Sequence, residues 1–164
     1  MHRWAAALLL ISLAACRYDE NGDLPECRIT LSGAINGSWD CRPATLTWNP
    51  SIGNAAALVF DVAAAPDRPQ IDASVGWARE PTAGQYLSSD ADAQGFVLVT
   101  LPDGTQYDMQ VGPPFNLGPG DNSWNLVLDS CDGPIRRYTG YAFNATGTLD
   151  ATLGGGALLM HVTF

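Results

Sequence analysis

The most regularly spaced carboxylates of this sequence lie in the run Asp90-Ala91-Asp92-Ala93-Gln94-Gly95. Oxygen-bearing side chains at alternate positions followed by glycine are typical of the start of a calcium-binding loop, because Ca²⁺ takes six to eight oxygen ligands. The glutamate that would close such a loop falls at Leu101. We therefore expect a solvated turn, with Asp90 and Asp92 as the candidate ligands if a metal ion binds.

Four tryptophans follow the first 25 residues: Trp39, Trp48, Trp77 and Trp124. An exposed indole ring can stack on the apolar face of a sugar while nearby polar side chains bind its hydroxyl groups. A domain of this size needs several large residues in its core, so most of the four are expected to be buried. Trp77 and Trp124 lie next to loop-like sequence, so exposure is expected at these two rather than at Trp39 or Trp48, and they are the candidate glycan-binding residues.

Apart from His2, the sequence contains one histidine, His161, in an alternating apolar and polar run. Its place in that run predicts an ordinary, partly exposed strand residue. The sequence has no G-x-S-x-G, H-E-x-x-H, phosphate-loop or Rossmann motif. A hydrolase that uses two aspartates is the remaining catalytic alternative, because folding sets the distance between such groups. We predict a protein without enzymatic activity and without a cofactor.

Three cysteines follow the first 25 residues: Cys27, Cys41 and Cys131. In an oxidising compartment they predict one disulfide and one remaining thiol, and three pairings are possible. If Asn36-Gly37 is a two-residue hairpin turn, Cys41 lies opposite Ser32 and Cys27 points to the other face. That geometry favours the pair Cys41 and Cys131.

Near its N-terminus the sequence has Arg3, an apolar run over residues 4–13 and, at the end of that run, Leu13-Ala14-Ala15-Cys16. The run is too short for a permanent membrane helix and is typical of an export signal. The last four residues resemble the lipobox of bacterial lipoproteins. The resemblance implies cleavage before Cys16, attachment of diacylglycerol to its thiol and anchoring in a membrane. The alternative is an ordinary secretory signal that is cleaved after Ala14.

Arg17 occupies the position at which lipoproteins retained in the inner membrane usually have Asp. The resemblance therefore favours the outer membrane of the cell envelope. We divide the chain into a signal peptide (1–15), an acylated cysteine with a polar tether (16–26) and one domain (27–164), whose length suits a single core.

From residue 27 onward, short apolar or alternating runs are separated by Gly, Pro, Asn and Asp. This pattern is typical of an antiparallel all-β domain. Strands are expected over 28–35, 38–48, 55–64, 71–77, 96–101, 105–111, 122–129, 138–153 and 157–164. In residues 138–153 and 157–164 the alternation predicts one buried and one solvated face. We predict a β-sandwich or barrel-like domain of about 8–10 short strands that follows an N-terminal signal helix.

The charge balance is acidic, with Lys plus Arg 8 against Asp plus Glu 17 and a formal net charge of −9. Binding to nucleic acid is disfavoured, because phosphate contacts need clustered cations. Residues 32–41 (SGAINGSWDC), 147–153 (GTLDATL) and the ending LLMHVTF resemble small uncharacterised lipoproteins of myxobacterial type, which implies no activity. We expect a membrane-anchored binding or structural module whose partner is an envelope protein or glycan.

Overall fold

The computed structural model describes residues 26–42, 45–51, 55–111, 122–137 and 140–164. The predicted signal helix, Cys16 and nearly all of the predicted tether lie outside the described residues. The strands are β1 (Arg28–Gly33), β2 (Gly37–Asp40), β3 (Thr45–Asn49), β4 (Ala55–Val62), β5 (Gln70–Trp77), β6 (Gly84–Leu87), β7 (Ala93–Thr100), β8 (Gln106–Val111), β9 (Ser123–Arg137), β10 (Gly140–Leu153) and β11 (Leu158–Thr163), with one 3-10 turn, η1 (Gly154–Gly156). All the strand pairs are antiparallel, which confirms the predicted all-β class.

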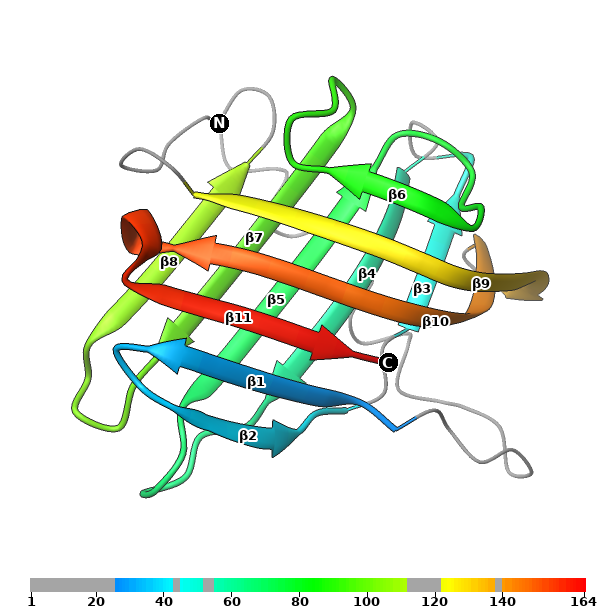
Figure 1. Ribbon diagram of the computed structural model, residues 1–164. Helices are drawn as coiled ribbons and strands as arrows, with labels where there is room; N and C mark the ends of the chain where they lie inside the picture. Colours follow the sequence, from blue (N-terminus) through cyan, green and yellow to red (C-terminus); the bar gives the residue numbers. More distant parts are fainter. Residues whose placement is uncertain (1–25, 43–44, 52–54, 112–121, 138–139) are drawn as a thin grey trace.

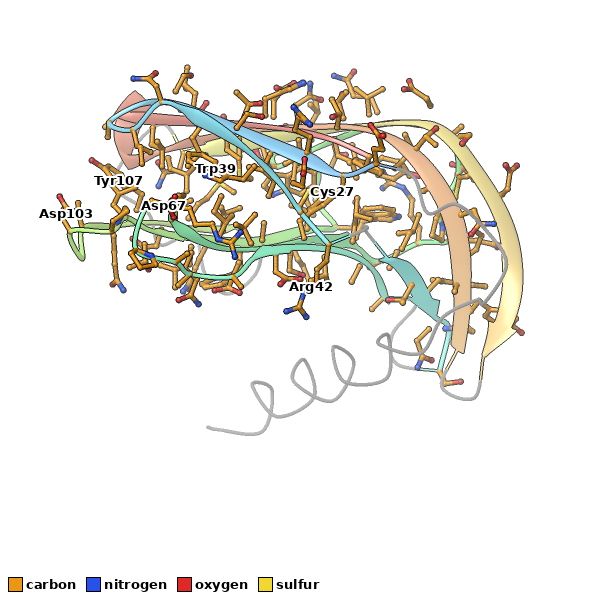
Figure 2. The ribbon with its side chains drawn as sticks, turned by 90° about the horizontal axis from the view of Figure 1, so that it is seen from below. Cys27, Trp39, Arg42, Asp67, Asp103 and Tyr107 are labelled. Carbon is orange, nitrogen blue, oxygen red and sulfur yellow. A yellow bond between two sulfur atoms is a disulfide. The ribbon has the colours of Figure 1, made fainter. Side chains whose placement is uncertain are left out.

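The strands form two layers that cross steeply (Figure 1). The β10 layer has the order β6-β9-β10-β11-β1-β2, and the β5 layer has the order β3-β4-β5-β7-β8. Figure 2 shows the two layers edge-on, with side chains filling the space between them. The core therefore lies between the layers.

Strand β10 belongs to both layers. Its residues 141–143 pair with β3 of the β5 layer, whereas residues 148–153 pair with β11 of the β10 layer. Figure 2 shows β9 and β10 curving from one layer toward the other. Irregularities in the β9–β10 register fall between Ala142 and Asn144 and between Thr146 and Gly147, as expected where a strand bends. The described part of the chain is thus one sheet of 11 strands folded over itself, with β2 and β8 at the two ends of its main path.

The predicted alternation in the last two strands is confirmed. Phe143, Ala145, Leu149, Ala151 and Leu153 of β10 are buried, as are Leu158, Met160, Val162 and Phe164 at the end of the chain. The side chains between them face solvent. Complete burial of one such leucine or valine contributes about 1.5–3 kcal/mol relative to an exposed position, so this hairpin supplies a large part of the core.

The strands differ from prediction in three main places. Strand β9 continues to Arg137, eight residues beyond the expected strand 122–129. The expected strand 38–48 is two strands, because the chain passes from β2 in one layer to β3 in the other. At this crossing the backbone N–H of Arg42 donates to Asp61 O at 3.2 Å and the Arg42 side chain pairs with the Asp61 carboxylate. Strand β6 was not predicted, because its four residues show no usable alternation.

The structure pairs Cys27 with Cys41, so the expected pair of Cys41 with Cys131 is wrong. The reason is the position of the turn. Register partners such as Ile29 and Trp39 place the turn at residues 33–36 instead of at Asn36-Gly37. Gly33 adopts φ 109° and its N–H donates to Asn36 Oδ1, which closes the turn at that point. With this register Cys27 lies directly opposite Cys41.

Cys131 is a free, half-buried thiol in β9. Its burial raises the pKa of the thiol, and the negative charges of Asp132 and Glu80 raise it further. Cys131 is therefore a poor nucleophile at neutral pH, because the thiolate is the reactive form.

Candidate functional site

Trp77 and Trp124 are buried, each with 2% of its surface exposed, so the expectation that they are exposed is wrong. Both side chains point inward from the ends of their strands. The ring of Tyr86 in β6 stacks on Trp77 with centroids 4.2 Å apart, and Trp124 packs against Gly95 of β7. A buried indole cannot stack on a sugar at the surface, which removes the glycan site predicted for these two residues.

These tryptophans belong to an aromatic layer made of Trp48, Trp77, Tyr86, Trp124 and Tyr141. The strand register places Trp48 opposite Ala56, Ala56 opposite Trp77, and Trp77 opposite Ala93, so large and small residues alternate across the β5 layer. Tyr141 stacks on Trp48 at 5.3 Å. The aromatic layer fills one end of the space between the two sheet layers.

Trp124 reaches this layer from the opposite sheet. A Cβ atom built on Gly95 would lie 2.4 Å from Trp124 Nε1, well inside the shortest normal contact, so the indole occupies the space that a side chain at position 95 would need. Gly95 is therefore required for close packing of the two layers here.

The indole N–H groups of Trp48, Trp77 and Trp124 are buried and have no hydrogen-bond partner within the described part of the chain. In contrast, the hydroxyl of Tyr86 donates to Thr82 O at 2.8 Å and accepts from Thr82 N at 3.0 Å. Leaving a buried donor without an acceptor costs about 1–3 kcal/mol, and folded proteins contain few such groups. Three of these buried donors without a partner in the described chain lie in one layer, and the other such atom is Arg68 Nε.

Asp90 and Asp92, the candidate calcium ligands, face an arginine that the sequence reasoning did not single out. Both carboxylate oxygens of Asp92 accept from Arg79 Nη1 at 2.7 Å, and Arg79 Nη2 lies 3.6 Å from Asp90 Oδ2. The same guanidinium lies over the ring of Tyr86, 5.0 Å from its centroid. The two carboxylates thus bind an arginine of their own segment, residues 78–92, and this arginine also lies over the Tyr86 ring of that segment. Among the described residues, no group of three or more His, Cys, Asp or Glu side chains is placed to hold a metal ion.

The outer face of the β5 layer carries an exposed apolar patch, here called the docking face. Its centre consists of Val59, Phe96 and Leu98, and its carboxylates are Asp61, Asp72 and Asp108. The register places these side chains in two neighbouring rows, Val59-Ser74-Phe96-Gln110 and Asp61-Asp72-Leu98-Asp108. Phe96 is 37% exposed, although it is a large apolar residue in the middle of a strand.

Two other large apolar side chains of the described chain are exposed, Leu87 and Leu159. Leu159 has Ser32 and Thr152 as its cross-strand neighbours, and Leu87 lies opposite Asn125. Phe96 alone has a large apolar neighbour, Leu98, two residues along the same face of its strand. The sequence contains this signal in the parity of residues 93–100, but the continuous run Phe96-Val97-Leu98-Val99 hides which residues point outward.

The outer face of the β10 layer is polar. A row of side chains crosses it in the order Ser38, Thr30, His161, Asp150 and Asn125. His161 Nδ1 lies 2.6 Å from Asp150 Oδ1, whereas the hydroxyl of Thr30 bonds to Ser38 at 3.1 Å. His161 is exposed on this face, as its alternation predicted. The Asp150 carboxylate orients the His161 imidazole. The hydroxyl of Thr30, opposite His161 in the register, bonds to Ser38 instead of to the imidazole.

The carboxylates that the structure brings together lie on outer surfaces: Asp61 beside Asp72, and Asp90 beside Asp92. Each pair has an arginine on one or both members, Arg42 in the first and Arg79 in the second. These aspartates therefore form surface ion pairs with arginine.

No helix in the described part of the chain is long and apolar enough to span a membrane. Comparisons with protein-family models, with curated proteins and with solved structures gave no match to this chain.

Proposed function

We propose that this chain is an exported lipoprotein, cleaved before Cys16 and anchored by that residue in the bacterial envelope, most favourably in the outer membrane. The resemblance of Leu13-Ala14-Ala15-Cys16 to a lipobox supports the proposal. The Cys27–Cys41 disulfide supports export as well, because disulfides persist in oxidising compartments.

The test of the anchor is Cys16→Ser, with Cys131→Ser as the matched control. The wild-type chain and the Cys131→Ser variant are expected in the membrane fraction with a metabolic fatty-acid label, whereas Cys16→Ser loses the label. A Cys16→Ser variant that keeps the label would show that the lipobox interpretation is wrong.

Within the envelope, we propose that the domain is a non-catalytic binding module that uses its docking face to bind a protein. The exposure of Phe96 beside Leu98 is the observation that carries this proposal. Protein interfaces typically combine an aromatic anchor at the centre with a polar rim that excludes water. On the docking face, Phe96 has Ser74 and Gln110 as cross-strand neighbours, and Leu98 lies between Asp72 and Asp108.

The charges of the docking face define the chemistry of the partner. Arg42 pairs with Asp61 at 3.1 Å, and Gln70 donates to Asp72 at 2.8 Å, while the Asp108 carboxylate accepts no protein hydrogen bond within the described chain. A face with three carboxylates and one arginine favours a partner with Lys or Arg around an apolar contact, because complementary charges speed association and exclude like-charged partners.

The test is photo-cross-linking in cells from position 110, which lies opposite Phe96 in the register. The wild-type chain is expected to give a defined adduct that Phe96→Ala abolishes. Leu159→Ala, at an exposed leucine on the other layer, is the control and is expected to keep the adduct. If Phe96→Ala leaves the adduct unchanged, or if position 110 gives none, the docking face is not a binding surface.

A further inference from the structure

The aromatic layer has hydrogen-bonding capacity that the described chain does not use. The indole nitrogens of Trp48, Trp77 and Trp124 are all buried donors without an acceptor. The strand register places Trp48, Trp77 and Ala93 in one row across the β5 layer. Trp124 packs against Gly95, which lies two residues after Ala93 in β7. Three unused donors therefore lie in one part of the interior, so a single explanation is needed for all of them.

We propose that this part of the interior binds a small, neutral, mainly apolar molecule that carries a carbonyl-type oxygen. The indole groups can only donate, so the ligand must offer an acceptor. The rest of the layer is aromatic ring and alanine, which suits an apolar body. No charged side chain is buried among the described residues, so an anion would have no counter-charge in the core and is disfavoured.

Residues 78–92, the segment that contains β6, cover the aromatic layer on one side, because Tyr86 of this segment stacks on Trp77. Strands β5 and β7, on either side of this segment, pair directly with each other from Gln70 opposite Thr100 to Trp77 opposite Ala93. The segment can therefore move without breaking the ladder of the β5 layer. It is held on the β10 layer by the four register pairs of β6 with β9, and Figure 1 shows β6 crossing in front of the β5 layer at the edge of the β10 layer.

Tyr86 is the part of this segment that covers the tryptophans. Its ring stacks on Trp77, and the guanidinium of Arg79 lies 5.0 Å from the centroid of the same ring while bound to Asp92. Movement of the segment uncovers Trp77, whose indole N–H is unpaired, and leaves most of the core undisturbed. This binding site is independent of the docking face, which lies on the outer surface of the β5 layer.

The experiment uses the mature chain with Cys16→Ser, so that no lipid or detergent competes. The probe is prodan, a neutral naphthalene ketone whose emission responds to hydrogen bonding at its carbonyl oxygen. Saturable binding is expected, with energy transfer from tryptophan to prodan. The matched control ligand is 2-(dimethylamino)naphthalene, which has the same ring system without the carbonyl group, and we expect it to bind about fivefold more weakly or less, the effect of one lost hydrogen bond.

Two substitutions locate the bound probe. Trp77→Phe and Trp124→Phe keep an aromatic ring and remove the donor, and each is expected to weaken prodan binding about fivefold. Trp39→Phe is the control, because Trp39 lies in β2 and its indole nitrogen is not among the unpaired donors; binding should stay within about twofold.

The proposal is overturned by any of three results: no saturable binding of prodan, equal binding of the carbonyl-free compound, or binding that Trp39→Phe weakens and the other two substitutions do not. The comparison of the two compounds needs no substitution, so it decides the question even if a variant fails to fold.

Discussion

Cys27 and Cys41 face each other directly across the β1–β2 hairpin. The Cys41 N–H donates to Cys27 O at 2.9 Å, and the two side chains form a disulfide. The bond joins the first residue of the predicted domain to the far end of the hairpin. It closes a loop that contains the turn at residues 33–36 and therefore fixes the register of β1 against β2.

Reduction of this disulfide, or the double substitution Cys27→Ser/Cys41→Ser, is expected to lower the free energy of unfolding. The sequence separation is 14, and closure of a loop of this length contributes about 3 kcal/mol in the chain-entropy model. Urea unfolding of the mature chain measures the change. Cys131→Ser is the control and should retain most of the stability, and a thiol titration in denaturant should find Cys131 free. An equal loss of stability in the control would contradict the pairing.

Gly95→Ala is expected to destabilise the domain by about 1–3 kcal/mol, the usual cost of overpacking a core. The added methyl group would meet Trp124, and Gly95 is not among the glycines at positive φ, so the cost is steric. In a Trp124→Phe background the same substitution should cost less. Urea unfolding of the four proteins of this double-mutant cycle gives the coupling energy, and additive effects would show that the two residues do not compete for space.

Cys131 should be alkylated slowly at neutral pH, with a rate that rises only above the pKa of an ordinary thiol. Burial and the charges of Asp132 and Glu80 all disfavour the thiolate, so the pKa is raised. Iodoacetamide kinetics between pH 7 and 11 measure the midpoint, and unfolding in urea should move it to lower pH. Glu80→Gln removes one of the charges and should also lower the midpoint. A midpoint at or below that of a free cysteine would contradict this environment.

Calcium at millimolar concentration is expected to leave the melting temperature unchanged. Arg79 already binds Asp92 with two hydrogen bonds and lies beside Asp90, so a cation would have to displace a guanidinium. Asp92→Asn should lower the stability by about 0.2–1 kcal/mol, the range of surface ion pairs. A rise in melting temperature on addition of calcium, abolished by Asp92→Asn, would contradict this prediction. Asp90 and Asp92 would then be metal ligands.

The fold class was predictable because the alternation in β10 and β11 is long and regular. One buried face forces apolar residues such as Leu149 and Leu153 to recur at every second position, and this pattern is visible without a structure. The pairing of the cysteines was not predictable in the same way, because the sequence contains two competing turn signals. Asn36-Gly37 is the stronger local signal, but the turn forms at Gly33, whose carbonyl and N–H both bond to the Asn36 side chain.

The positions of the tryptophans depended on contacts between residues far apart in the sequence. Alternation can place Trp77 and Trp124 on the inward face of their strands, but it cannot show that Tyr86 and Gly95 pack against them. The ion pairs of Arg79 with Asp90 and Asp92 were not predictable for the same reason, because the sequence around the two aspartates shows only a turn. The local sequence pattern identifies the strands, whereas the residues that pack on each side chain depend on pairing between distant strands.

The pairing of β1 with β11 has a consequence for the order of folding. Every residue of β1, from Arg28 to Gly33, has a partner in β11, and β3 pairs with β10. Strand β1 thus depends on a strand made more than 120 residues later, and β3 on one made more than 90 residues later. This arrangement slows folding because distant segments must meet. Under the export proposed above, a chain that enters a translocation channel by its N-terminal end cannot complete this domain until Thr163 has followed. It therefore stays unfolded while it is being moved.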